Sequence, residues 1–255
     1  MRQKIFMIST GRTGTAFFAS FFDDFFVGVE SYHTTKNTEL VNVLGNLAHV
    51  GIAPKKLTEK IFELIKCKWF DSHQECYVEC NPYYWKFVEA LKRKYPETKF
   101  VFVVRSPKGY IISHIQKENQ SWRSKLANRF LPFWQPISIR DYLRYLSKTS
   151  LYERVDFYAK VWRVKNKELL MLREQMKNSR LIKFEDIFDS EKGVKTVKEL
   201  LRWLELSPKK KLDGAILMKK TNVSQNLNLG WDEKCDEIVK KTCQNLSEKL
   251  GYAKR

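Results

Sequence analysis

The chain has 255 residues, of which 43% are hydrophobic and 14% aromatic, enough to build a sizeable core. Its 47 basic residues outnumber its 29 acidic residues and give a net charge of +18, which favours anionic partners without choosing among them. The chain holds no run of about 18 apolar residues, so we expect no membrane span. Its first residues predict a strand and not a signal peptide.

The five cysteines are odd in number and scattered along the chain. This pattern is typical of reduced thiols, and we therefore expect a cytoplasmic protein. Cys67, His73, Cys76 and Cys80 lie near one another in the sequence, but their spacing matches no zinc-binding pattern.

Short apolar runs alternate with longer amphipathic stretches. We expect strands at residues 4–9, 26–30, 75–79, 99–104 and 180–184. Helical patterns cover residues 16–26, 38–50, 55–69, 83–95, 139–177, 192–206 and 231–250, with Gly251 as a C-terminal cap. This alternation predicts an α/β fold, a single domain over residues 1–255, with three layers and a mainly parallel central sheet flanked by helices. We expect the ligand site at the carboxyl ends of the strands.

The first motif with chemical character is the loop Ser9–Thr15, sequence STGRTGT, which joins the first strand to the first helix. Its two glycines allow a tight turn, and the backbone N–H groups of such a turn bind anions at a helix N-terminus. Arg12 adds a cation. The loop is shorter than a Walker A loop and has no lysine before its hydroxyl. Taken alone, it is either an anion-binding loop or an ordinary turn.

The second motif is VVRSPKGYIIS, residues 103–113. Arg105 ends the strongest predicted strand, and Pro107 suits the first turn of the next helix. Ser113 lies eight positions beyond Arg105, on that helix. The pair predicts a second phosphate site, separate from the loop. Taken alone, Arg105 could equally cap a strand or form a salt bridge.

Together the two motifs resemble the sulfotransferases that use 3'-phosphoadenosine-5'-phosphosulfate (PAPS), whose fold is P-loop-NTPase-like. The resemblance implies a sulfuryl transfer from PAPS as co-substrate, with adenosine 3',5'-bisphosphate as product. It assigns the 5'-phosphosulfate to Gly11, Arg12, Thr13, Gly14 and Thr15. It assigns the 3'-phosphate to Arg105 and Ser113.

Two further stretches are similar to that family. Residues 181–187 (LIKFEDI) resemble its strand that ends in an aromatic residue, Glu and Asp. Residues 219–224, then Gly230-Trp231 and the ending 249–252, resemble the C-terminal loop that closes over the 3'-phosphate. The donor-binding candidates of that loop are Lys219, Lys220, Asn222 and Ser224.

The sequence also departs from the family. Arg12 stands where many cytosolic members carry lysine, and the C-terminal loop lacks their R-K-G pattern. Residues 79–84 (ECNPYY) resemble the E-K-x-P-x-Y-F segment of glycan sulfotransferases without its lysine. The acceptor therefore stays open among glycans, lipids, peptides and small molecules. Residues 116–150 either select it or form a plain lid.

Sulfuryl transfer needs positioning, neutralisation of charge on the leaving phosphate, and removal of the acceptor proton. Arg12 and the loop amides would neutralise charge, and we expect no metal, because a sulfuryl group carries less charge than a phosphoryl group. The family places a histidine or glutamate near the sulfur. His33 is our first choice as base, with Glu30 and Glu79 as alternatives. Each could instead have a structural role.

Two other functions compete with this interpretation. A nucleotide kinase would share the fold, but it requires a Walker lysine and has no need of the Arg105 and Ser113 pair. A nucleic-acid-binding protein would suit the net charge. The basic residues are spread along the chain and no nucleic-acid-binding motif is recognisable, so we expect no nucleic-acid partner. The oligomeric state has no signature in the sequence.

Overall fold

The computed structural model describes residues 3–73, 75–122, 126–128, 131, 133–147, 150–189, 191–218 and 229–252. Its strands form one sheet in the order β2-β3-β1-β4-β5, and every pairing is parallel. The predicted α/β fold with a parallel central sheet is confirmed. The strands are β1 (Lys4–Ser9), β2 (Val29–His33), β3 (Cys76–Asn81), β4 (Lys99–Val104) and β5 (Ser179–Lys183).

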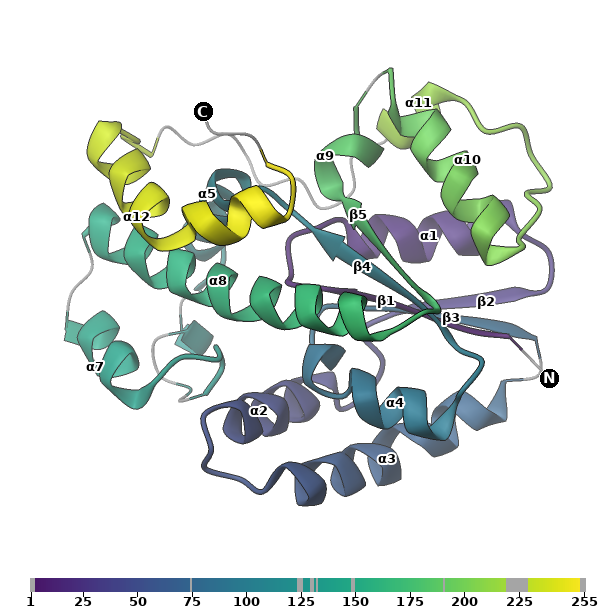
Figure 1. Ribbon diagram of the computed structural model, residues 1–255, viewed down its shortest axis with the longest axis horizontal. Helices are drawn as coiled ribbons and strands as arrows, with labels where there is room; N and C mark the ends of the chain where they lie inside the picture. The colour runs from purple at the N-terminus through teal and green to yellow at the C-terminus, as the bar shows by residue number, and fades with distance from the viewer. Residues whose placement is uncertain are drawn as a thin grey trace.

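Helices cover both faces of the sheet (Figure 1). One face packs against α1 (Thr15–Phe25), α9 (Phe184–Ile187), α10 (Gly193–Leu204) and α11 (Gly214–Met218). The core on the other face includes side chains of α2 (Thr38–His49), α3 (Lys55–Ser72), the 3₁₀ turn η1 (Tyr84–Lys86), α4 (Val88–Lys94), α5 (Pro107–Gln120), α7 (Ile139–Ser147), α8 (Leu151–Gln175) and α12 (Glu233–Lys249).

The central strands are apolar along their whole length because both of their faces are buried. In β1, Phe6 and Ile8 belong to one hydrophobic cluster, whereas Ile5 and Met7 belong to the other. Strand β4 divides its side chains between the two clusters in the same alternating way. The sheet thus separates two cores and holds the ends of its strands in fixed positions.

Most predicted elements match the structure, with three instructive shifts. Strand β2 begins at Val29 and not at residue 26, because Phe26 packs in the core and Gly28, with φ of 70°, turns the chain before the strand. The pattern at residues 83–95 divides into η1 and α4. The long pattern at residues 139–177 divides into α7 and α8, because Ser150 and Glu153 form a capping box that starts a new helix.

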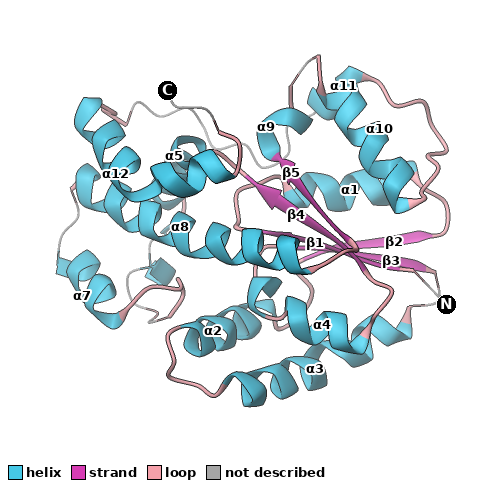
Figure 2. Cartoon of the chain, in the orientation of Figure 1, coloured by secondary structure: helices cyan, strands magenta, loops and turns pink. Residues whose placement is uncertain are grey.

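All five strands run in the same direction, so their carboxyl ends meet at one edge of the sheet (Figure 2). The loops that follow β1, β2, β3 and β4 therefore converge there. Over the described ranges, no helix combines the length and apolar character that a membrane crossing requires.

Candidate functional site

A cavity of about 750 Å³ lies at the carboxyl edge of the sheet, a volume within the range of sites for small ligands. The loop after β1 forms one side of it, and the ends of β2, β3 and β4 contribute further residues. Helices α5 and α8 supply the opposite side. The polar lining includes Thr10, Arg12, Thr13, Thr15, His33, Tyr83, Arg105, Ser113, His114, Lys117, Asn128, Gln135 and Lys165.

The loop after β1 has the backbone shape of an anion-binding turn. Gly11, Arg12 and Gly14 all have positive φ angles, of 92°, 56° and 78°. Such left-handed residues turn neighbouring N–H groups toward a common side. Gly14 also caps α1 without a side-chain hydrogen bond, so the first N–H groups of that helix receive no side-chain oxygen from the cap. The hydroxyl oxygens of Thr10 and Thr13 are buried and have no partner among the described residues.

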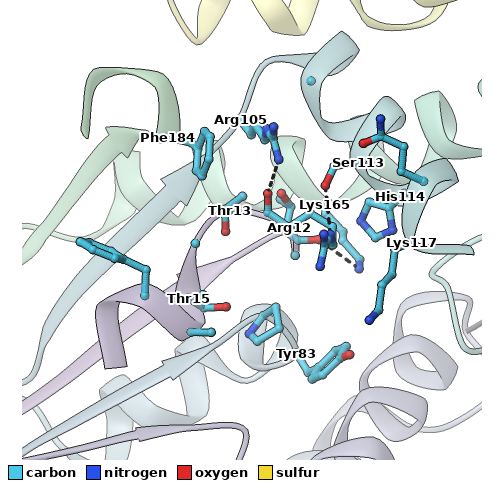
Figure 3. A pocket seen from close by; sticks show the side chains of 18 of the residues that line it. Arg12, Thr13, Thr15, Tyr83, Arg105, Ser113, His114, Lys117, Lys165 and Phe184 are labelled. Atoms are coloured by element: carbon cyan, nitrogen blue, oxygen red, sulfur yellow. Dashed lines mark hydrogen bonds between the residues drawn. The ribbon is translucent and has the colours of Figure 1, made fainter. Parts of the chain in front are cut away.

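The two sequence motifs meet inside this cavity (Figure 3). The Arg12 Nε donates a hydrogen bond to the Oγ of Ser113 over 3.0 Å. The Arg105 Nη1 donates to the backbone oxygen of Arg12 over 2.8 Å. Burial lowers the pKa of both arginines, but a guanidinium remains charged at neutral pH. The structure therefore brings two fixed cations and a hydroxyl together in one space.

Two contacts hold Arg105 in place besides its hydrogen bond to the Arg12 backbone oxygen. Its guanidinium lies 4.3 Å from the centre of the Phe184 ring, and its backbone oxygen accepts a hydrogen bond from Trp162 on α8. Its Nε is buried without a partner among the described residues. Because the guanidinium is fixed and its Nε–H is free to donate, Arg105 is suited to bind an anion.

Two of the other stretches that resemble the family, residues 181–187 and 249–252, contact each other next to this arginine. Glu185 accepts hydrogen bonds from the backbone N–H of Ser106 over 2.9 Å and from the hydroxyl of Tyr252 over 3.0 Å. The Lys183 ammonium donates to the backbone oxygen of Gly251 over 2.6 Å. Segments more than sixty residues apart in the sequence thus form one support for the cavity wall.

His33 ends β2 and lies against the loop. Its Nε2 is 3.0 Å from the Oγ1 of Thr15, the first residue of α1, and its Nδ1 is 3.3 Å from the Oγ1 of Thr34. His33 is exposed as a residue, but the protein packed beside its ring partly desolvates it, and this desolvation lowers its pKa. A histidine with a lowered pKa is neutral at pH 7 and can accept a proton.

The two carboxylates considered as alternative bases lie outside the cavity lining. Glu30 contacts His73 and Tyr32 on the other side of β2. Because side chains alternate along a strand, Glu30 and His33 point to opposite faces, so Glu30 does not orient the histidine.

Glu79 is completely buried. It accepts hydrogen bonds from Tyr77, Thr35 and Asn81, and burial raises its pKa. This carboxylate belongs to an internal hydrogen-bond network and not to the wall of the cavity.

Two titratable cavity residues, His114 and Lys165, were not predicted from the sequence. Lys165 was hidden in the charged helix α8, where lysines usually face solvent. It nevertheless follows Tyr158 and Trp162 and precedes Leu169, on the apolar stripe of that helix. Its position on an apolar stripe is the sequence feature that indicates a buried side chain.

Other predictions fall partly or wholly outside the site. Lys219, Lys220, Asn222 and Ser224 lie outside the described residues. Of the segment 116–150, parts do line the cavity, among them Lys117, Asn128, Trp134 and Gln135. Within the described ranges, no three His, Cys, Asp or Glu side chains cluster closely enough to hold a metal ion.

Comparison with known proteins gives similarity at the level of structure. No protein-family model matches the sequence, and no curated protein matches it. The structure resembles the sulfotransferase domain from the curacin biosynthetic pathway and a sulfotransferase from Alicyclobacillus acidocaldarius, each with a TM-score of 0.58 and 12% identity. The alignments cover 100% of this chain and 99% and 98% of those chains. A sulfotransferase domain of a Synechococcus olefin synthase gives a TM-score of 0.53 at 12% identity, covering 100% of this chain and 96% of that one.

Proposed function

Since the chain has the sulfotransferase fold, we propose that it transfers a sulfuryl group from PAPS to a hydroxyl or amine acceptor and releases adenosine 3',5'-bisphosphate. The observation that carries this proposal is the meeting of Arg12, Arg105 and Ser113 in one cavity at the carboxyl edge of the sheet. A donor with two anionic ends needs two groups of cations and donors within a nucleotide's length of each other. Arg12 with the loop amides, and Arg105 with Ser113, would supply these two groups.

The described residues fit such a donor. The buried hydroxyls of Thr10 and Thr13 and the Nε of Arg105 are donors that have no partner within the described part of the chain. The loop amides and Arg12 would hold the 5'-phosphosulfate at the N-terminus of α1. Arg105 and Ser113 would hold the 3'-phosphate, because the Ser113 hydroxyl accepts from Arg12 and keeps its own hydrogen to donate.

Catalysis would depend on charge and proton placement. Arg12 is fixed by its contact with Ser113 and would stabilise the negative charge that grows on the leaving phosphate. His33, neutral at pH 7, would accept the acceptor's proton from its position beside Thr15. The positions of Glu30 and Glu79 outside the cavity lining favour the histidine.

The acceptor would lie beside Tyr83 and Trp134. Both side chains line the cavity, and their ring centres are 6.1 Å apart. Gln135 lies beside them, and its Oε1 is buried without a partner among the described residues. Rings next to amide groups suit an acceptor that has both apolar and polar parts.

We also propose a single domain and a cytoplasmic location. All five cysteines are free thiols, and four of them are buried, which suits a reducing compartment.

Transfer of labelled sulfate tests the function. The protein is incubated with [³⁵S]PAPS and pools of phenols, amines, glycans and lipids, with Arg12→Ala as the matched control. We expect label in at least one acceptor pool and release of adenosine 3',5'-bisphosphate, both lost in the control. Transfer of label from [γ-³²P]ATP, with none from PAPS, would identify a kinase instead.

A further inference from the structure

Lys165 is a buried lysine of the cavity that the proposed function leaves without a role. It lies on α8 and is only 3% exposed. Its Nζ donates to the backbone oxygen of Thr10 over 3.4 Å, a long contact to the residue that precedes Gly11. An ammonium group has three hydrogens to donate, so the described residues leave most of its capacity unused.

The charge around this ammonium is unbalanced. The cavity lining also contains the cations Arg12, Arg105 and Lys117. Its one described carboxylate is Glu118, which is engaged by Arg154 over 3.0 Å and by Tyr145 over 2.7 Å. Buried charges are normally paired, because removing an ion from water is costly. Among the described residues of the lining, this ammonium therefore has no anion to pair with.

The neighbouring histidine supports this interpretation. The Nε2 of His114 is buried without a partner among the described residues, and it lies 3.7 Å from the position that a Cβ on Gly11 would take. Figure 3 shows His114, Lys165 and Arg12 reaching into the same part of the cavity. Burial, together with the charges of Lys165 and the two arginines, keeps the pKa of His114 well below its usual value.

We propose that Lys165 is a further binding residue for the anionic donor, and that its ammonium contacts a phosphate or sulfuryl oxygen beside Arg12. This inference rests on the proposed function only in taking the ligand to be an anionic nucleotide. Binding would supply the missing counter-ion and the missing hydrogen-bond acceptor at once. It changes no covalent bond.

A consequence is that a proton enters with the ligand. Burial lowers the pKa of Lys165 to about 7, so much of the free protein carries a neutral amine just above that pH. A bound anion favours the charged form and raises this pKa, and the proton comes from solvent. Affinity should therefore fall as pH rises above about 7, by up to tenfold per unit.

The other charged and titratable groups of the cavity cannot imitate this effect above pH 7. The pKa values of His33 and His114 are lowered by burial, so ligand binding would have to raise them from below 6.5 to well above 7 before either ring could take up this proton. Burial raises the pKa of Tyr83. The two arginines stay charged. Phosphate groups lose their second proton near pH 6, so the ligand is ionised. The full set that lines the cavity is Arg12, His33, Tyr83, Arg105, His114, Lys117, Glu118 and Lys165.

Calorimetry of adenosine 3',5'-bisphosphate in buffers of different ionisation enthalpy, at about pH 8, measures this proton uptake. We expect the wild type to take up close to one proton. Lys165→Met should take up none and bind about tenfold or more weakly at pH 7, where a charge-assisted hydrogen bond is lost. Lys117→Met, which removes an exposed cation from the same cavity, should keep the proton uptake.

Two outcomes would overturn the inference: no proton uptake in the wild type, or equal uptake in Lys165→Met. The first measurement needs no variant, so the inference stays testable even if Lys165→Met fails to fold. Inorganic pyrophosphate, titrated in parallel, separates the two proposals. Failure of the nucleotide to bind, with pyrophosphate bound through Lys165-dependent proton uptake, would reject the proposed function and keep the lysine as an anion-binding residue.

Discussion

The Arg12 guanidinium and the Ser113 hydroxyl lie 3.0 Å apart, although their positions in the sequence differ by 101. This contact joins the loop after β1 to the helix after β4. Arg105 reinforces it by donating to the backbone oxygen of Arg12. The groups proposed for the two ends of the donor are therefore coupled, and a change at one end is expected to disturb the other.

Replacing Arg105 tests recognition of the 3'-phosphate. Arg105→Ala should lower the affinity for adenosine 3',5'-bisphosphate about ten- to a hundredfold, because a charge-assisted hydrogen bond is lost. The affinity for adenosine 5'-phosphate should fall less. Some decrease is expected because Arg105 also holds the loop after β1 through the backbone oxygen of Arg12. Calorimetry with both ligands measures the difference, and Arg180→Ala, on β5 beside Trp203, is the control. Equal losses for both ligands would remove the 3'-phosphate assignment.

Arg12 should act more on turnover than on product binding. Arg12→Ala removes the cation that meets charge developing on the leaving group, so kcat should fall more than affinity for adenosine 3',5'-bisphosphate. Ser113→Ala keeps the Arg12 cation but removes the hydrogen bond that fixes its side chain. We therefore expect a smaller decrease in kcat than in Arg12→Ala. Steady-state kinetics with calorimetry separates the two effects. Normal kcat with poor binding in Arg12→Ala would show that this arginine only anchors the ligand.

The base is tested by pH. Desolvation lowers the pKa of His33, so activity should be lost as pH falls through a value below the usual 6.5 of histidine. His33→Ala should lower kcat about a hundred- to ten-thousandfold and abolish that acidic limb. Glu30→Gln and Glu79→Gln should keep the limb. A limb that persists in His33→Ala and disappears in one of the glutamine variants would move the role to that carboxylate.

Gly14 tests the loop's shape independently of catalysis. Its φ is 78°, and a Cβ there would lie 3.0 Å from the Phe188 ring. Gly14→Ala should therefore cost about 1–2 kcal/mol, or roughly 2–8 °C in Tm for a domain of this size, and weaken ligand binding. Gly214→Ala is the matched control, since no atom lies within 4 Å of its Cβ position. Equal melting temperatures for both variants would contradict the backbone argument.

Strands buried on both faces could be placed from the sequence because their apolar runs are continuous. Residues 4–9 and 99–104 match β1 and β4 at both ends. Strand β2 was placed three residues early at each end, because Phe26 extends the apolar run although it packs at the end of α1. The motif residues Arg12, Arg105 and Ser113 were found because glycines, a proline and strand ends mark their positions.

The contacts among those residues could not be predicted. The hydrogen bond of Arg12 to Ser113 depends on side-chain directions across the cavity. Glu79 was a plausible base by position, since it precedes the end of β3, yet the pleat buries it among Tyr77, Thr35 and Asn81. The burial of this carboxylate depends on the helices that pack over β3, and the sequence of the strand itself carries no signal of it.

The proposed function requires this cavity to recognise a 3'-phosphorylated adenosine nucleotide. The most direct test is calorimetry of the wild type with adenosine 3',5'-bisphosphate, adenosine 5'-phosphate, ATP with Mg²⁺, and a short oligonucleotide. We predict that adenosine 3',5'-bisphosphate binds at least about tenfold more tightly than adenosine 5'-phosphate, equally well with and without EDTA. Binding of ATP with Mg²⁺, or salt-sensitive binding of the oligonucleotide, with none of the bisphosphate, would contradict the proposed function.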